Sequence, residues 1–558
     1  MQLTCTNKKN SKMKPKQARR LDDMPAEILW NVVEQLESDE FERAAIAAFS
    51  RVSKRIRAVT LPAIFNRITS NSEARRTGPS GPQYISSLPG LLRTVVTNPD
   101  IAAMIDEVDL TWWYDLMPII FPADIAAFQK AAARFGLLVP PGLRCSVDAT
   151  TRNSSHVGGT NRLRDPVGGW KELNPEPDYY WLAEMLLLHT PNVRKLNYRL
   201  VHRGYRATES SALKVLDTAS QSGILARPLF PKLEHARFND LDGLQRLRSL
   251  GVWAPNLLAL HLERHKNQQG AQIHLSCPLR HVTDLVLGDV LIGGSQCKVL
   301  ISAFPALKRF HYRSAEPDVV DGVRDPICSP QQVIDALKPV QGRLTRLELF
   351  AGKWHLYGSH TDPMIIELED QTNQQIRTGI ITDLTGFGAL EHLVVDGNSL
   401  REGLAEGEFV HNSADQPADS VICQGKLPAT LKTLSLTDLE HLLFLRDLEM
   451  FDAKNCCPEL ETITVDYIGP EMLAKKAWNK RMSSLTTHFA EEHGVRFERV
   501  NGDYVSCVFY NYSMGNKCNC TGVWRNGPWH GYQYELEHDL SRRSDVEKRE
   551  GLLANFCR

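Results

Sequence analysis

A short pattern of apolar residues recurs along the chain, and it constrains the fold more than any other feature of the sequence. The pattern is an apolar residue, two residues of any kind, a second apolar residue, one residue of any kind and a third apolar residue. Its ten copies begin at Ile105, Val193, Leu233, Leu257, Val282, Leu307, Leu344, Leu390, Leu431 and Leu460. Three consecutive intervals, between residues 233, 257, 282 and 307, span 24, 25 and 25 residues. Such a period is typical of stacked repeat proteins.

Each copy is expected to form one strand. The last two apolar residues of a copy are two positions apart, so on a strand both side chains point to the same, inward face. One unit cannot bury this face alone, so neighbouring units must stack, with apolar stretches such as 180–189 and 296–303 packing behind the strands as helices. Several copies follow a proline by two residues, at Pro191, Pro231, Pro255, Pro305 and Pro458. The pattern predicts an α/β fold with a parallel sheet.

The residue between the last two apolar positions of each copy should point outward. Together these residues would form a row across the sheet: Asn197, Arg237, His261, Val286, His311, Glu348, Val394, Ser435 and Thr464. The row mixes cations, histidines, an acid and small residues, which suits a protein partner better than a phosphate backbone. We predict that a protein substrate binds along this row, through Asn197, Arg237, His261, His311, Glu348, Ser435 and Thr464.

The repeats resemble those of leucine-rich-repeat solenoids, in the irregular form that is often joined to an F-box. The resemblance covers residues 101–500 and implies a curved solenoid that binds another protein. The asparagine of regular repeats is missing, so an irregular α/β domain with ordinary buried strands stays an alternative. Long polar insertions at 140–178, 313–331, 352–379 and 401–420 interrupt the array. Insertions of this length are usually functional or disordered.

Residues 21–68 predict two or three short amphipathic helices. Pro25 follows two aspartates and Met24, which is a favourable start for a helix. Apolar residues then recur at helical spacing. They are Ile28, Leu29, Val32, Val33 and Leu36, then Phe41, Ala44, Ala45, Ala48, Phe49, Val52, Ile56 and Val59. Leu61-Pro62 should end the last helix. So small a module has little core, and a partner would stabilise it.

This module resembles an F-box, in its Pro25-x-Glu-Ile-Leu opening, its Val52-Ser-Lys-Arg core and its Leu61-Pro-x-Ile-Phe close. The resemblance implies docking on the Skp-type linker protein of a cullin–RING ubiquitin ligase. The docking residues that it implies are Leu21, Pro25, Glu27, Ile28, Leu29, Val32, Leu36, Val52, Lys54 and Pro62. Met24 departs from the usual leucine, and Phe41 stands where Asp-Leu often begins the second helix. An unrelated helical hairpin, or an F-box that never enters a ligase, are the alternatives.

Charge is unevenly distributed along the chain. The whole chain has 65 Lys and Arg against 66 Asp and Glu, but its first 20 residues hold seven cations and no acid. We expect 1–20 to be a disordered basic tail, with a nuclear-localisation or nucleic-acid-binding segment as the alternative. Residues 69–100 read as a linker, and 501–558 as a cap or tail. Twelve scattered cysteines and the lack of a signal-like segment predict a cytoplasmic or nuclear protein with no membrane span.

No convincing catalytic pattern is present in the sequence. A Walker A loop, a dinucleotide-binding glycine fingerprint, a Gly-x-Ser-x-Gly elbow and a His-Glu-x-x-His motif are all missing. Cys507, Cys518, Cys520 and His530 superficially offer four zinc ligands, but their spacing fits no standard finger. The other histidines are dispersed without metal-binding spacing. We therefore predict a non-enzymatic protein without cofactor or metal.

These features predict a substrate-recognition subunit of an SCF-type ubiquitin ligase. The F-box would dock on the linker protein, and the solenoid would hold a protein substrate near the ubiquitin-loaded conjugating enzyme. This chain would therefore accelerate ubiquitin transfer by proximity. One alternative is a repeat scaffold that binds protein partners without ubiquitin transfer. Another is an enzyme in the Cys- and Trp-containing C-terminal segment. The sequence does not identify the substrate.

Overall fold

The fold was analysed in a computed structural model of the 558-residue chain. The structure describes residues 24–37, 42–69, 74–78, 81–86, 88–112, 117–118, 120, 122–140, 143, 176–200, 213–221, 228–239, 247–263, 265, 278–315, 319–320, 323–324, 328–351, 379–400, 420–437, 443–467 and 474–501. Within these ranges no helix combines the length and the apolar character needed to cross a lipid bilayer. The basic segment 1–20, Leu21, the segment 502–558 and most of the four insertions lie outside the described residues.

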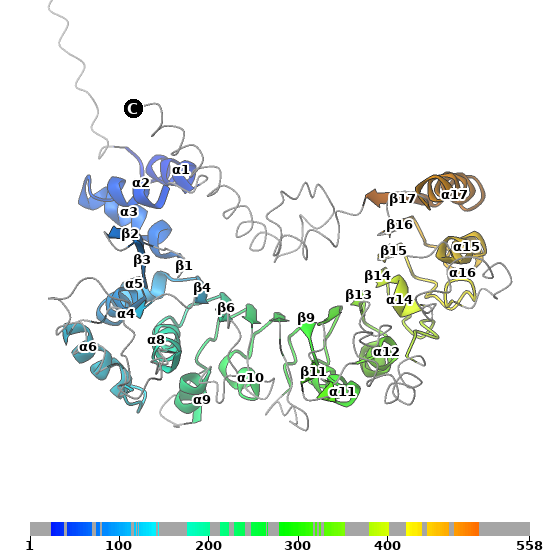
Figure 1. Cartoon of the computed structure of the whole chain (residues 1–558). Coiled ribbons are helices and arrows are strands. Elements are labelled where there is room, and N and C mark those ends of the chain that lie inside the picture. The colour runs from blue at the N-terminus through cyan, green and yellow to red at the C-terminus, as the bar shows by residue number, and fades with distance from the viewer. Residues whose placement is uncertain are drawn as a thin grey trace, which may run out of the picture. The chain divides into compact units, whose positions relative to one another are not determined.

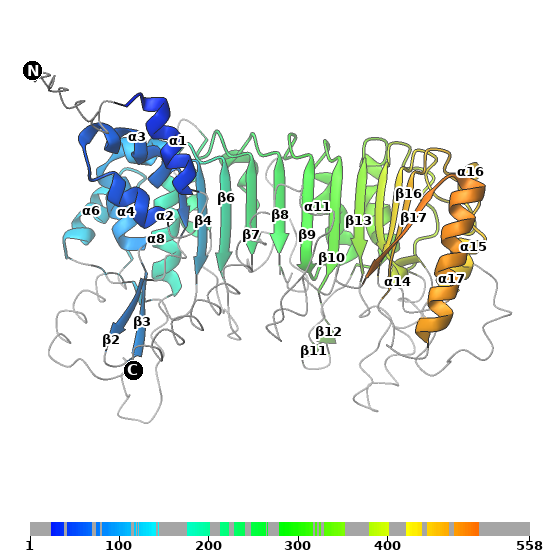
Figure 2. The ribbon, with the colours of Figure 1, turned by 90° about the horizontal axis from the view of Figure 1, so that it is seen from above.

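A sheet of twelve strands dominates the structure, and its strands lie side by side in chain order: β1, β4, β6, β7, β8, β9, β10, β13, β14, β15, β16 and β17. Their bounds are Arg67–Thr69, Glu107–Trp112, Lys195–Leu200, His235–Asn239, Ala259–Glu263, Asp284–Val290, Arg309–Ser314, Arg346–Phe350, His392–Asp396, Thr433–Thr437, Thr462–Tyr467 and Arg496–Asn501. From β7 to β17 every neighbouring pair is parallel, and Figure 2 shows β7 to β10 side by side. The predicted α/β class with a parallel sheet is confirmed.

All ten copies of the apolar pattern lie at strands of this sheet. Their inward pairs are buried, as at Leu434 and Leu436 of β15, which are both 0% exposed. The first apolar residue of each copy is buried as well, just before its strand, as at Leu431. Two further strands, β1 and β17, extend the sheet beyond the predicted copies. The predicted inward and outward alternation is therefore correct for the apolar positions.

The recurring proline lies in a tight turn that leads into the strand. At Pro255 the turn is closed by the Leu257 N–H, which donates to the Ala254 carbonyl at 3.2 Å. The same bond recurs before Val193, Leu233, Leu307 and Leu460. In each turn proline takes the second position, where its fixed φ suits the backbone and no N–H is needed. The proline offset thus sets the point at which these five strands begin.

The chain forms two compact units, residues 1–197 and 198–558. In the second unit, helices follow the strands: α9 Lys214–Gln221, α10 Leu250–Trp253, α11 Gly294–Ser302, α12 Pro330–Leu337, α14 Gly397–Leu400, α15 Leu443–Glu449, α16 Ala453–Cys456 and α17 Ala474–His488. Figure 1 shows α10, α11 and α12 on one side of their strands. A small hairpin of β11 Val319–Val320 and β12 Val323–Arg324 precedes α12, and a 3-10 turn, η4 at Lys338–Val340, follows α12. A π-turn, η7 at Phe489–His493, continues α17.

The first unit begins with three helices, α1 Ala26–Glu37, α2 Glu42–Phe49 and α3 Lys54–Phe65. The predicted helical character of this segment is confirmed, but two boundaries differ. The second apolar run is split between α2 and α3, because Ser53 caps α3 by accepting a hydrogen bond from the Ile56 N–H. Helix α3 also continues through Pro62 to Phe65, so the prediction that Leu61-Pro62 ends it is wrong. A proline deletes one backbone bond, which the surrounding packing can outweigh.

The segment predicted as a linker, 69–100, contains regular structure. Strands β2 Ala74–Gly78 and β3 Gly81–Ser86 form an antiparallel hairpin, and β5 Met117–Pro118 pairs with β3. Helix α4 Leu88–Thr97 buries Leu92 and Val95, and α5 Pro99–Met104 follows it. The linker prediction is therefore wrong here. Gly78 and Gly81 flank the turn of the hairpin, and Pro89 occupies the first turn of α4, where proline is tolerated. Helices α6 Pro122–Ala133 and α8 Glu176–Leu188 complete the described part of this unit.

Candidate functional site

The three N-terminal helices pack around a small apolar core. Leu29 and Val33 of α1, Ile46 of α2 and Ile56 of α3 are at most 2% exposed. Residues 29 and 33 are one helical turn apart, so they face the same direction. Leu29 had been expected to contact a partner, and its complete burial corrects that assignment, because its side chain stabilises the module itself.

Large apolar side chains are exposed on this small module. Met24, Ile28, Trp30 and Val52 are 36%, 43%, 38% and 61% exposed. They make up four of the nine large apolar side chains exposed in the described part of the chain, although 24–52 is a short stretch. Single exposed apolar residues need no explanation, whereas several in one short module make it a candidate interaction surface. We call these four residues the N-terminal apolar set.

The other residues implied by the F-box resemblance have different environments. Pro25, Glu27 and Lys54 are exposed, and Val32 and Pro62 are half-buried. Leu36 lies in α1, but its side chain is outside the description, and Leu21 is outside it altogether. Ile28 and Val52 are thus the predicted docking residues with the clearest apolar exposure. Met24 and Trp30 were not selected from the sequence, although the exposed side of an amphipathic helix could have indicated Trp30.

The outward row is aligned across the second unit as predicted. Arg237 pairs with His261 in register, His261 with Val286 and Val286 with His311. The alignment continues through Glu348, Val394, Ser435 and Thr464. Glu498 of β17 extends the row by one strand beyond the predicted members. The described registers do not include the pairing of Asn197.

Arg237, His261 and Glu348 of this row are buried, although their positions between the inward residues predict that they point outward. Arg237, His261 and Glu348 are 4%, 5% and 4% exposed, and Asn197 is 5% exposed. Asn197 donates a hydrogen bond from Nδ2 to Oδ1 of Asp109 at 3.0 Å, within the first unit. The remaining members, Val286, His311, Val394, Ser435 and Thr464, are half-buried. Burial of a charge needs a partner, and the neighbouring strands supply it.

One ion-pair network joins strands β7 and β8. Both carboxylate oxygens of Glu263 accept hydrogen bonds from Nη2 of Arg237, at 2.6 and 2.7 Å, and Nε2 of His261 lies 2.8 Å from Oε1 of Glu263. Burial alone would raise the pKa of Glu263, but the charges of Arg237 and His261 outweigh it and hold this pKa well below its usual value. Burial lowers the pKa of His261 although Glu263 acts in the opposite direction. The carboxylate is therefore ionised at neutral pH.

A second network joins β10 and β13. Nδ1 of His311 lies 2.8 Å from Oε2 of Glu348, and Nε of Arg346 lies 2.5 Å from Oε1 of the same carboxylate. Burial opposes ionisation of Glu348, but the hydrogen bond and charge of His311, together with Arg346, lower its pKa. The His311 ring also contacts the Phe350 ring, with centroids 5.3 Å apart. Glu263 and Arg346 were not predicted, because neither belongs to the row. Each lies two positions from a row residue on its own strand, so its side chain is on the same face of the sheet and within reach of the row.

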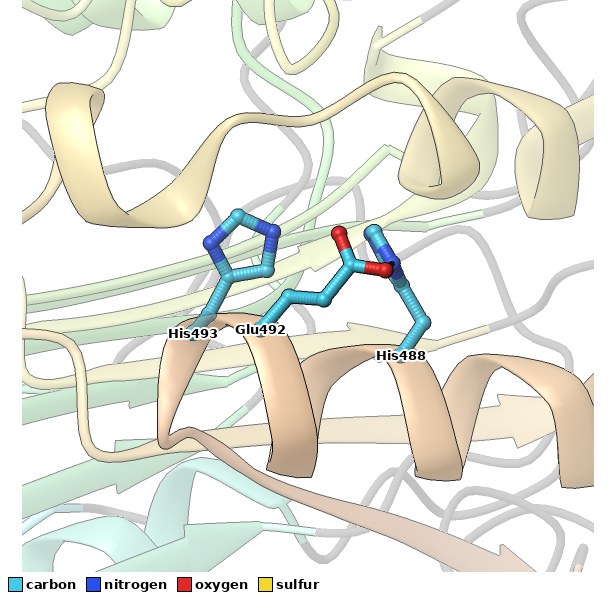
Figure 3. A group of neighbouring side chains, drawn as sticks. All are labelled: His488, Glu492 and His493. Atoms are coloured by element: carbon cyan, nitrogen blue, oxygen red, sulfur yellow. Dashed lines mark ion pairs between the residues drawn. The ribbon is translucent and has the colours of Figure 1, made fainter.

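A third group lies at the end of α17. His488, Glu492 and His493 each offer one ligand atom, and these atoms lie within 4.8 Å of one another. Figure 3 shows all three side chains projecting from the same side of the helix. The sequence showed no metal-binding spacing here, and the structure brings these residues together. The zinc candidates Cys507, Cys518, Cys520 and His530 lie outside the described residues.

Two comparisons with known proteins found no match for this chain. No model of a protein family matches it, and no curated protein is similar to it. Function must therefore be argued from the surfaces and side chains described above.

Proposed function

We propose that this chain is the substrate-recognition subunit of an SCF-type ubiquitin ligase. Its N-terminal helical module would dock on a Skp-type linker protein, and through it on a cullin–RING ligase, while the face of the sheet that carries the outward row binds a protein substrate. The observation that carries this proposal is the N-terminal apolar set, which exposes four large apolar side chains on a module with a core of its own. Such a chain acts in the cytoplasm or nucleus.

The N-terminal module supports docking for an energetic reason. Burying apolar surface stabilises association by about 25 cal/mol for each square ångström removed from water. Ile28 and Val52 offer much of their surface without any rearrangement of the core, since neither is buried within the module. Glu27 is adjacent to Ile28 and Lys54 lies two positions after Val52, and both are exposed, so that polar groups can surround the apolar contact.

The sheet supports substrate binding through its half-buried row members. His311 on β10 retains exposure, as do Val394, Ser435 and Thr464 on the adjacent strands β14, β15 and β16. The buried pairs Arg237–Glu263 and His311–Glu348 hold the neighbouring side chains in place. A rigid and chemically mixed surface of this kind suits recognition of a protein. The same chain without ubiquitin transfer would be a repeat scaffold, which is the alternative function.

Affinity capture of the full chain tests the proposal. We expect the native chain to co-purify a Skp-type linker protein and a cullin, and the double variant Ile28→Asp with Val52→Asp to retain at least tenfold less of both. Both side chains are exposed, so the substitutions leave the module folded, whereas they place unpaired charges in the docked interface. Leu138→Asp is the matched control, because Leu138 is 87% exposed and lies outside the module.

Two outcomes would count against the proposal. Equal capture by the native chain and the double variant would disprove docking through the N-terminal apolar set. Capture of the linker protein without a cullin would favour the scaffold instead.

A further inference from the structure

We propose that His488, Glu492 and His493 bind a divalent transition-metal ion of the Zn²⁺ type and leave one coordination position open. The three ligand atoms already lie within 4.8 Å of one another. Around a tetrahedral zinc ion, nitrogen and oxygen ligands at their usual bond lengths are about 3.4 Å apart. Small rotations, chiefly of the exposed Glu492 side chain, would therefore bring the group to binding geometry without movement of the backbone.

The π-turn is what brings the two histidines together. In a regular α-helix, residues five apart point about 140° away from each other, whereas residues four apart share a face. His488 and Glu492 are four apart and form an ion pair of 3.2 Å. His488 and His493 are five apart, and η7 widens the helix so that the Gly494 N–H donates to the Phe489 carbonyl. Single π-turns within helices frequently occur at functional sites.

Aromatic packing holds both imidazole rings in place. The His488 and His493 rings meet edge to face with centroids 5.0 Å apart, and each also contacts Phe489, at 5.3 and 5.6 Å. Phe489 is fully buried and stacks on Phe497 of β17, with centroids 5.4 Å apart. Ligands fixed by packing lose little entropy on binding an ion, which favours metal affinity.

Both rings also carry a nitrogen that lacks a partner. Nε2 of His488 and Nδ1 of His493 are shielded from water and have no hydrogen-bond partner among the described residues. A buried polar atom without a partner is costly, and rearrangement toward a shared metal ion is one way to satisfy it. This observation is independent of the distance between the three residues.

The donor set indicates the class of ion. Two imidazoles and one carboxylate suit Zn²⁺ and other late divalent metals, whereas Ca²⁺ and Mg²⁺ prefer oxygen ligands alone. Three protein ligands with an open fourth position are typical of zinc sites that hold water or an incoming group. The Glu492 side chain is 65% exposed, so the carboxylate side of the cluster faces solvent. A bound protein could supply the fourth ligand.

Zinc titration of the metal-free full chain by calorimetry tests this site. We expect Glu492→Gln to weaken one zinc site at least tenfold, and the pair His488→Gln with His493→Gln to lower the stoichiometry by one. Glu491→Gln is the matched control, since Glu491 is an adjacent, exposed glutamate outside the cluster. It should bind zinc like the native chain.

Cobalt(II) absorption separates this site from any site built on cysteine. The native chain should show a nitrogen–oxygen cobalt component, without thiolate charge transfer, that the histidine pair variant lacks. Equal zinc stoichiometry in the native chain and that variant would overturn the proposal, as would an equal loss in Glu491→Gln. If the histidine pair variant does not fold, the exposed position of Glu492 lets Glu492→Gln decide alone.

Discussion

Arg237 shows how a charged residue can be buried on the outward side of a strand. Its guanidinium binds both oxygens of Glu263 from the next strand, and the side chains of the pair are only 5% and 16% exposed. Hydrogen bonds between an ionised donor and an ionised acceptor are roughly twice as strong as those between neutral groups. Removal of one member leaves the other charge buried without compensation, which costs more than the pair itself contributes.

We therefore predict that Glu263→Gln lowers the free energy of unfolding by about 3–5 kcal/mol. Glu391→Gln is the matched control, because Glu391 pairs with Lys432 at 3.1 Å but the two side chains are 41% and 37% exposed. An exposed pair contributes about 0–1 kcal/mol. Urea unfolding of both variants measures the difference. Equal losses would show that the Arg237–Glu263 pair is not specifically stabilising.

The same pair predicts a dependence on pH. Because the folded pKa of Glu263 lies well below its usual value, the unfolded chain takes up the proton first as the pH falls. The contribution of Glu263 is present above the ordinary glutamate pKa of about 4.3 and is lost as the pH falls through the folded pKa. The stability difference between the native chain and Glu263→Gln should therefore shrink in acid.

At the scale of the element, the end of α17 shows how backbone geometry creates a site. The π-turn η7 closes with Gly494 in the left-handed conformation, at φ 68° and ψ 19°. Glycine adopts this conformation without strain, whereas a residue with a Cβ does not. The turn also places His493 beside His488, and it leads directly into β17.

Gly494→Ala should therefore destabilise the protein by about 1–2 kcal/mol through backbone strain alone. No atom lies within 4 Å of a Cβ added at Gly494, so steric overlap is not involved. Gly388→Ala is the matched control, since its added Cβ also meets open space but its φ is not positive. That variant should be neutral or slightly stabilised. Chemical denaturation compares the two, and a neutral Gly494→Ala would contradict the strain argument.

At the scale of the whole molecule, the sheet is built from contacts between neighbours. Each strand from β7 to β16 pairs with the strands that come before and after it in the order of the sheet, and β17 pairs with β16 at its end. The inward residues follow the same order, as Leu393, Leu434 and Ile463 lie in register on β14, β15 and β16. Stability in such an array is approximately a sum of unit and nearest-neighbour terms.

We predict that Leu434→Ala raises hydrogen exchange locally. The substitution removes a fully buried side chain and should cost about 2–5 kcal/mol. Peptides from β14 to β16 should lose protection, while those from β8 keep it, because the effect reaches only adjacent units. Val299→Ala, at a 47% exposed position in α11, is the control and should change neither region. Equal loss of protection in β8 and β15 would show that the unit unfolds as one body.

The sequence by itself determined the positions of ten strands of the sheet, their inward faces and, where a proline precedes the strand, the point at which it begins. These properties are local, because side chains alternate along a strand and proline has a fixed φ. Thus Leu434 and Leu436 identify β15, and Pro255 identifies the turn before β8. The first and last strands of the sheet, β1 and β17, were not predicted, because they carry no copy of the apolar pattern.

The tertiary structure alone decided which of these residues are available for function. Arg237 and Glu263 are 26 residues apart, and they meet because parallel pairing fixes the register of β7 and β8. Leu29 and Ile28 are adjacent in sequence, yet only packing of α1 against its neighbours buries the first and exposes the second. His493 joins His488 through a π-turn that no residue spacing specifies. Each outcome depends on contacts between distant segments or on helix geometry, which short sequence patterns do not encode.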